Sequence, residues 1–150
     1  MNAFTLLKDD HEKVAGILEK IDATTERAKK GREELFTQLK NELDVHTRIE
    51  EEILYPALEE YEETRAISLE AYEEHALVKQ LLEELASAPK NDEQWTAKFS
   101  VLKENIEHHV EEEEGEMFKK ARKILSEGEI VALGERLQEA KKVGKSAMAG

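Results

Sequence analysis

Residues 106–118 read IEHHVEEEEGEMF, two adjacent histidines followed closely by four consecutive glutamates. A run of like charges is usually a solvated helix face, so the question is whether any residue of this stretch faces inward. Residues three and four apart share a helix face, which places His109 in one row with Ile106 and Glu113. His108 falls in a more polar row. We therefore predict that His109 faces the interior and His108 the solvent.

The same pattern occurs earlier in the chain. HVEEEEGEMF at 109–118 aligns with HTRIEEEILY at 46–55, and EEHALVKQLLEEL at 73–85 aligns with DDHEKVAGILEKI at 9–21. Both alignments superpose a histidine on a histidine, and the first also superposes a glutamate four residues later. The chain therefore resembles two copies of one helical hairpin, which predicts a pseudo-twofold four-helix bundle.

Helical periodicity and breaker residues divide the chain into five helices. Pro56 is expected to kink or end the second helix, and Gly115 to bend the fourth. SEGE at 126–129 is a capping box that opens a shorter fifth helix. The prediction is an all-α protein, an antiparallel up-down-up-down four-helix bundle over 1–125, with a C-terminal helix and tail over 126–150 packed on it. The expected helices run over 3–27, 32–61, 64–87, 92–125 and 126–146.

Each long helix carries one histidine within its apolar stripe. Residues at equal height in an antiparallel hairpin are symmetric about the turn. The midpoints between consecutive histidines are 28.5, 60.5 and 92, and all three fall in turn-like segments: RAKKG, EEYEET and PKND. An up-down-up-down bundle would therefore hold all four side chains at one level, facing inward. These histidines are His11, His46, His75 and His109.

Glu50 and Glu113 each follow an inward histidine by four residues and share its helix face. Buried charges without partners cost several kcal/mol, and a metal would compensate them. Six ligands exceed one tetrahedral zinc and suit two octahedral ions bridged by both carboxylates, with an oxide or hydroxide as a further bridge. Nitrogen and oxygen donors without sulfur suit Fe, Mn or Zn, and open positions favour iron. The predicted ligands are His11, His46, Glu50, His75, His109 and Glu113.

Composition restricts the function further. The chain has 150 residues, enough for one domain, and no cysteine, which excludes disulfides and thiol chemistry. A net charge of −13 disfavours nucleic acid and anionic membranes as partners. No apolar run could span a bilayer, and the N-terminus lacks the features of a signal peptide, so the cytoplasm is the expected location.

The motifs resemble the hemerythrin-like (HHE) cation-binding domain family. Its pattern is a histidine on each of four helices and His-x-x-x-Glu on the second and fourth, which HTRIE at 46–50 and HVEEE at 109–113 match. The similarity covers roughly 3–125 and includes EILYPAL and GEMFKKA. It implies a di-iron protein that senses, binds or reduces O₂, NO or peroxide, or that donates iron in cluster repair, and it leaves open whether the protein is an enzyme.

Two alternatives stay open beside this reading. One is a helical interaction or sensor module whose metal is structural or absent, and the other is a reversible oxygen carrier. Oxygen-carrying members have a further histidine one turn after the third-helix ligand, where this chain has Lys79. The resemblance therefore implies that both ions keep an open position, which favours oxidation in air over reversible binding. We expect Lys79 to extend outward.

Several other residues have less specific signals. Asp10 and Glu74 precede two of the histidines and are expected either to orient imidazoles or to lie on the surface. The remaining glutamates of the acidic run are expected to be solvated: Glu111, Glu112 and Glu114. The aromatic residues are expected in the core rather than in a redox relay: Tyr55, Tyr72, Trp95 and Phe99. Three C-terminal lysines either complement an acidic face or mark a partner site: Lys141, Lys142 and Lys145.

Overall fold

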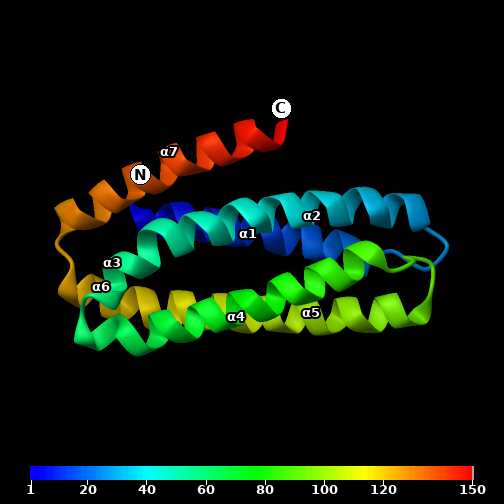
Figure 1. Cartoon of the computed structure of the whole chain (residues 1–150), viewed down its shortest axis with the longest axis horizontal. Helices are drawn as coiled ribbons and strands as arrows, with labels where there is room; N and C mark the ends of the chain where they lie inside the picture. Colours follow the sequence, from blue (N-terminus) through cyan, green and yellow to red (C-terminus); the bar gives the residue numbers. More distant parts are fainter. Residues whose placement is uncertain (150) are drawn as a thin grey trace.

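The computed structural model describes residues 1–149, which are almost entirely helical and contain no strand. Four helical rods pack antiparallel, and α7 lies along the outside of the first two (Figure 1). The first rod is α1 (Ala3–Asp22) and the third is α4 (Glu62–Ser87). The second rod joins α2 (Lys29–Ile49), the π-helical turn η1 (Glu50–Leu54) and α3 (Tyr55–Glu59). The fourth joins α5 (Glu93–Glu112), the π-helical turn η2 (Glu113–Met117) and α6 (Phe118–Ile124).

These elements confirm the predicted all-α class, the up-down-up-down bundle and the fifth helix. The Ser126 capping box is present: the Glu129 N–H donates to Ser126 Oγ at 3.1 Å, and the Ser126 N–H donates to Glu129 Oε1 at 2.9 Å. The resulting helix, α7 (Glu127–Ala149), is longer than expected. Gly150, the end of the predicted tail, lies outside the described residues.

The first helix is shorter than its periodicity suggests. It ends at Asp22, not near residue 27, because Thr24 caps it by donating from Oγ1 to the Ile21 carbonyl at 2.6 Å. The buried Arg32 then holds this loop, since its Nε donates to Thr24 Oγ1 at 2.7 Å. Local side-chain bonds of this kind compete with further helical turns.

Pro56 does not end the second rod, which continues to Glu59. Proline removes one backbone donor and would clash with a carbonyl of the preceding α-helical turn. The π-helical turn η1 directly before it widens the helix at that point. One carbonyl that this arrangement releases, that of Glu51, accepts a hydrogen bond from the Tyr72 hydroxyl at 3.3 Å.

The apolar core is divided into two clusters by a polar layer. One cluster lies toward the 23–28 and 88–92 loops and includes Leu39, Leu85 and Trp95. The other lies toward the opposite end and reaches α7, with Phe4, Leu54, Phe118 and Leu137 among its members. Between them each rod contributes a buried histidine. No helix within residues 1–149 is long and apolar enough to span a membrane.

Candidate metal centre

The second and fourth rods change their helical pitch at equivalent places. η1 begins at Glu50 and η2 at Glu113, so each π-helical turn starts at a predicted ligand. The Tyr55 N–H donates to the Glu50 carbonyl, and the Phe118 N–H donates to the Glu113 carbonyl, five residues back in both cases. Such turns are frequent at functional sites. Each brings the aromatic residue at i+5 over the glutamate, where the residue at i+4 would otherwise lie.

The wider turn also changes which residues face the core. The regular helical spacing of three and four residues predicts that Ala57 faces the core in the same row as Glu50 and Ile53. Ala57 is only half-buried, however. Leu58 is fully buried instead. The reason is the extra residue in η1, which rotates everything after it by about 100° around the helix axis.

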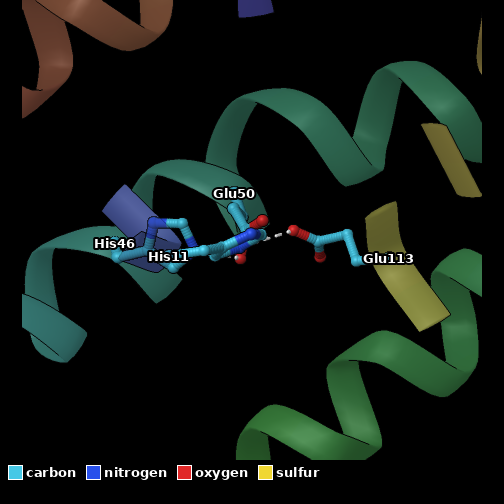
Figure 2. Close-up of side chains that lie close together, drawn as sticks. All are labelled: His11, His46, Glu50 and Glu113. Carbon is cyan, nitrogen blue, oxygen red and sulfur yellow. Dashed lines mark ion pairs between the residues drawn. The ribbon is translucent and has the colours of Figure 1, made fainter. Parts of the chain in front are cut away.

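All six predicted ligands lie in the polar layer, and both carboxylates take part in two separate groups. The first, called here the His11 group, contains His11, His46, Glu50 and Glu113, and Figure 2 shows these side chains turned toward one another. His11 Nε2 lies 3.3 Å from Glu113 Oε1, and His46 Nε2 lies 3.2 Å from Glu50 Oε1. The side chains come from the first, second and fourth rods.

The second group, called here the His75 group, contains Glu50, His75, His109 and Glu113. His75 Nε2 lies 3.2 Å from Glu50 Oε1, and His109 Nε2 lies 3.1 Å from Glu113 Oε2. Both glutamates belong to both groups, and each group by itself supplies four donors that could hold a metal ion.

Every imidazole is also held from its outer side. The four Nδ1 atoms pair with carboxylate oxygens: His46 with Asp10 at 3.0 Å, His109 with Glu74 at 2.6 Å, His75 with Glu51 at 2.9 Å and His11 with Glu114 at 2.5 Å. A carboxylate on Nδ1 fixes the ring and its tautomer and leaves Nε2 as the inward donor. The pairs follow the internal repeat, so both halves of the bundle orient their rings alike.

These contacts refine the expectations for the acidic residues. Asp10 and Glu74 do accept from histidines, but from those of the neighbouring rod and not from the adjacent residue in sequence. The expectation that Glu114 is solvated was wrong, because it is half-buried against His11. Glu51 plays the matching part for His75 and was missed. Its only sequence signal is its alignment with Glu114 in the repeat.

Four buried atoms in the layer have no hydrogen-bond partner among the described residues. They are His11 Nε2, His46 Nε2, Glu50 Oε2 and Glu113 Oε1. Buried polar atoms are paired in most native structures, and each unpaired one costs about 1–3 kcal/mol. All four belong to the His11 group, where one cation would satisfy them together. The residues present therefore fit a bound metal.

Electrostatics within the layer raise the pKa values of three histidines and lower that of Glu113. Burial alone would lower the pKa of His109, but hydrogen bonds to Glu113 and Glu74 outweigh it and raise that pKa to about 10. The pKa values of His46 and His75 are raised by the same balance of burial against carboxylate partners. Burial would raise the pKa of Glu113, but its bonds to Glu50 and His109 hold it well below the usual value. A metal must therefore displace histidine protons to bind.

His108 and Lys79 both lie where they were expected. The His108 side chain is 65% exposed and lies 3.3 Å from Glu112 Oε1, away from the layer. Lys79 is exposed and lines a groove of about 520 Å³ between α2 and α4, which His75 also lines. Beside the four inward histidines lies a much smaller cavity of about 20 Å³, lined by apolar residues that include Val14 and Val78. That volume exceeds the roughly 10–15 Å³ needed for one water-sized ligand.

The aromatic residues divide between packing and the site. Trp95 and Phe99 stack at 5.6 Å in the apolar cluster near the loops, as the core assignment predicts. Tyr55 was also assigned to the core, and its ring does pack against Tyr72 at 5.3 Å. Its hydroxyl, however, donates to Glu113 Oε2 at 2.5 Å and lies 3.2 Å from Glu50 Oε1. The sequence therefore placed the Tyr55 ring correctly but did not indicate that its hydroxyl contacts the site, a second omission beside Glu51.

The C-terminal lysines contact the bundle. Lys141 Nζ donates to Asp10 Oδ1, while Asp10 Oδ2 accepts from His46. Burial would raise the pKa of Asp10, but His46 and Lys141 outweigh it and lower the pKa to about 2. Lys145 lies 3.5 Å from Glu42, and Lys142 is exposed. Two of the three lysines therefore complement acidic residues of this chain.

Comparison with known proteins agrees with this architecture. An uncharacterized protein of Mycobacterium tuberculosis is 28% identical over 145 residues, 91% of this chain and 83% of that protein. An uncharacterized hemerythrin-like protein of Schizosaccharomyces pombe is 31% identical over 103 residues, 67% of this chain and 51% of that protein.

A crystal structure from Mycobacterium kansasii, of a hemerythrin HHE cation-binding domain-containing protein, superposes with a TM-score of 0.85 at 29% identity. The superposed region covers 98% of this chain and 89% of the Mycobacterium kansasii chain. The family model of the hemerythrin HHE cation-binding domain matches residues 2–121, which include all four rods but for the last residues of α6. The chain therefore belongs to the hemerythrin HHE cation-binding domain family.

Proposed function

We propose that the protein binds two iron ions in the polar layer and uses them to bind or reduce a small ligand such as O₂, NO or peroxide. One observation carries the proposal: two groups of four buried donors share both of their carboxylates. In this assignment the ligands are His11, His46, Glu50, His75, His109 and Glu113. Iron in such a site supplies electrons and open coordination positions.

The chain's own residues have three tasks in this function. The outer carboxylates hold the Nδ1 protons and aim Nε2 inward. The two glutamates, at 0% and 1% exposure, bring anionic charge that balances the cations. The apolar clusters on both sides exclude bulk water. The cavity of about 20 Å³ beside the histidines favours ligands of a few atoms.

The geometry favours a resident metal over one that is lent to other proteins. Both glutamates and all four histidines are buried, and a carboxylate holds each imidazole at Nδ1, so the site is built to keep an ion in place. An interaction module without a functional metal would leave the four unpaired atoms unexplained. The net charge of −13 disfavours nucleic acid or an anionic membrane as a partner, and we keep the cytoplasm as the expected location.

The first test is stoichiometry. Protein loaded anaerobically with ferrous iron and freed of excess metal should contain about two ions per chain by elemental analysis, because two complete donor groups are present. The absorbance of the loaded protein should also change on oxidation. One ion per chain in tetrahedral geometry would contradict the bridged pair, and an absorbance independent of redox state would favour a structural metal.

The second test is reactivity. We expect the reduced protein to be oxidised rapidly in air and to react with NO or peroxide, because the two shared carboxylates are anionic and favour the oxidised metal. The measurement is a stopped-flow mix of reduced protein with O₂, followed by NO titration under anaerobic conditions. A colour change that reverses under vacuum would instead support a reversible oxygen carrier.

A further inference from the structure

The outer carboxylates, those that pair with the Nδ1 atoms of the histidines, correspond through the internal repeat, but one of them has an additional partner. Asp10, which accepts from His46, corresponds to Glu74, which accepts from His109. Asp10 also accepts from Lys141 Nζ of α7 through its other oxygen. Within the described part of the chain, no other lysine or arginine forms a salt bridge with an outer carboxylate. The charge around the two donor groups is therefore unequal.

Glu74 has another carboxylate nearby in place of an ammonium group. Glu74, His108 and Glu112 each have a nitrogen or oxygen atom within 4.8 Å of such atoms of the other two. The repeat aligns His108 and Glu112 with Val45 and Ile49, two buried residues beside α7. The C-terminal helix thus covers one half of the bundle and adds a positive charge there, while the corresponding face of the other half stays acidic.

The pair of Lys141 and Asp10 is buried enough for its charge to act on the neighbouring histidine. The side chain of Asp10 is 5% exposed and that of Lys141 is 25% exposed. Charges in such surroundings interact more strongly than in water, because the local dielectric constant is low. The ammonium group and the His46 ring bind the two oxygens of one carboxylate, so each reduces the negative charge that the other experiences. His46 therefore has a less anionic partner than His109 has.

This difference should change how the two groups treat a bound metal. A carboxylate on Nδ1 raises the basicity of the imidazole as a ligand. Basic ligands and negative charge favour the higher oxidation state, and the reduction potentials of protein-bound iron follow the net charge and the hydrogen bonds around it. Lys141 therefore favours the reduced state for an ion in the His11 group, which contains His46. The His75 group lacks a corresponding contact within the described chain.

We propose that Lys141 is a positioning residue that acts through Asp10 and His46, and that it gives the ion of the His11 group the higher reduction potential of the two. This inference rests on the proposed function. When a one-electron donor reduces the oxidised site, the electron should go to the ion of the His11 group and leave the ion of the His75 group ferric. The C-terminal helix then sets the electronic inequality of a site whose ligands are related by the repeat.

The experiment uses the full chain loaded with two irons. Lys141→Met removes the ammonium group but keeps an unbranched side chain, and it should lower the midpoint potential of the first reduction by about 59 mV, a tenfold shift in the one-electron equilibrium. Lys141→Arg keeps the charge and should retain the wild-type potential. Lys145→Met is the matched control, because Lys145 lies one turn further along α7 and pairs with Glu42 instead of an outer carboxylate. It should leave the potential unchanged.

Asp10→Asn tests whether Lys141 acts through the carboxylate. The amide oxygen can still accept from His46 Nδ1 but carries no charge, so this substitution should raise the potential. In the Asp10→Asn background, Lys141→Met should have no further effect, because the charge that it modulates is gone. Asp10→Asn leaves Lys141 on α7, so it tests the electrostatic step even if Lys141→Met loosens the helix. A potential that falls in Asp10→Asn would contradict the proposal.

A readout without iron uses the zinc-loaded chain, which has no redox chemistry and suits NMR. The Nδ1 proton resonance of His46 should move to lower field in Lys141→Met, because its hydrogen bond to Asp10 strengthens, while that of His109 should stay in place. An unmoved His46 resonance, an unchanged potential in Lys141→Met, or an equal fall in Lys145→Met would overturn the role of Lys141 and leave the proposed function intact. Failure of the wild type to bind any metal would overturn both.

Discussion

At the residue scale, the two adjacent histidines of the fourth rod have different surroundings: His109 lies in the polar layer and His108 lies on the surface. His109→Ala should lose at least one of two irons, because it removes an inward Nε2 and leaves Glu74 without its partner. His108→Ala removes an exposed side chain and should keep the full iron content. Elemental analysis of both variants after identical loading is the measurement. Equal losses, or a loss confined to His108→Ala, would show that the assignment of the inward histidine is wrong.

The sequence alone places these residues because their geometry is set by long regular helices. Four histidines whose midpoints all fall in turns must lie at one height in an antiparallel bundle, and the structure has them at one height. The six predicted ligands come together for the same reason. That they bind metal stays a prediction until iron content is measured.

At the scale of elements, α7 is positioned by a close approach to the N-terminus. A Cβ at Gly134 would lie 2.7 Å from the Ala3 nitrogen and from the Asn2 carbonyl carbon, and backbone atoms cannot move aside cheaply. Gly134→Ala should therefore lower the free energy of unfolding by about 1–3 kcal/mol, the usual cost of overpacking. Chemical denaturation monitored by circular dichroism measures it.

The matched control is the same substitution where space is open. A Cβ at Gly16, within α1, meets nothing within 4 Å, so Gly16→Ala should raise the free energy of unfolding by about 0.5–1 kcal/mol through helix propensity. Equal effects of the two substitutions would mean that α7 does not dock on the N-terminus as described. Displacement of α7 should also disturb the candidate metal centre, because Lys141 on α7 contacts Asp10, which in turn holds His46.

The elements that sequence reasoning missed are the two π-helical turns. Periodicity assumes 3.6 residues per turn, so it cannot anticipate an extra residue that the tertiary structure introduces. Pro56 and Gly115 mark where the rods are irregular, but not how. The errors at Ala57 and Glu114 share this cause, since both residues follow a π-helical turn or lie within one. The unexpected contact of the Tyr55 hydroxyl with Glu113 has the same cause, although Tyr55 lies in the core as predicted.

At the scale of the whole molecule, a charged layer divides the core, and its protonation should control stability. His109 has a folded-state pKa of about 10 against an ordinary value of about 6.5, and the pKa values of His46 and His75 are also raised. A raised pKa contributes stability that is fully present below about pH 6.5 and is lost as the pH rises toward 10. The metal-free protein should therefore become less stable across this window.

Bound metal reverses that dependence, because the inward nitrogens must be deprotonated to coordinate it and the apparent affinity rises with pH. The melting temperature of the iron-loaded protein should exceed that of the metal-free protein at pH 6, and the difference should widen toward pH 9 as the two curves diverge. Each kcal/mol corresponds to about 2–4 °C in a chain of this size, so scanning calorimetry at several pH values can resolve the change. A metal-dependent difference that stays constant between pH 6 and pH 9 would mean that iron displaces no histidine protons, and therefore that it binds elsewhere than in the polar layer.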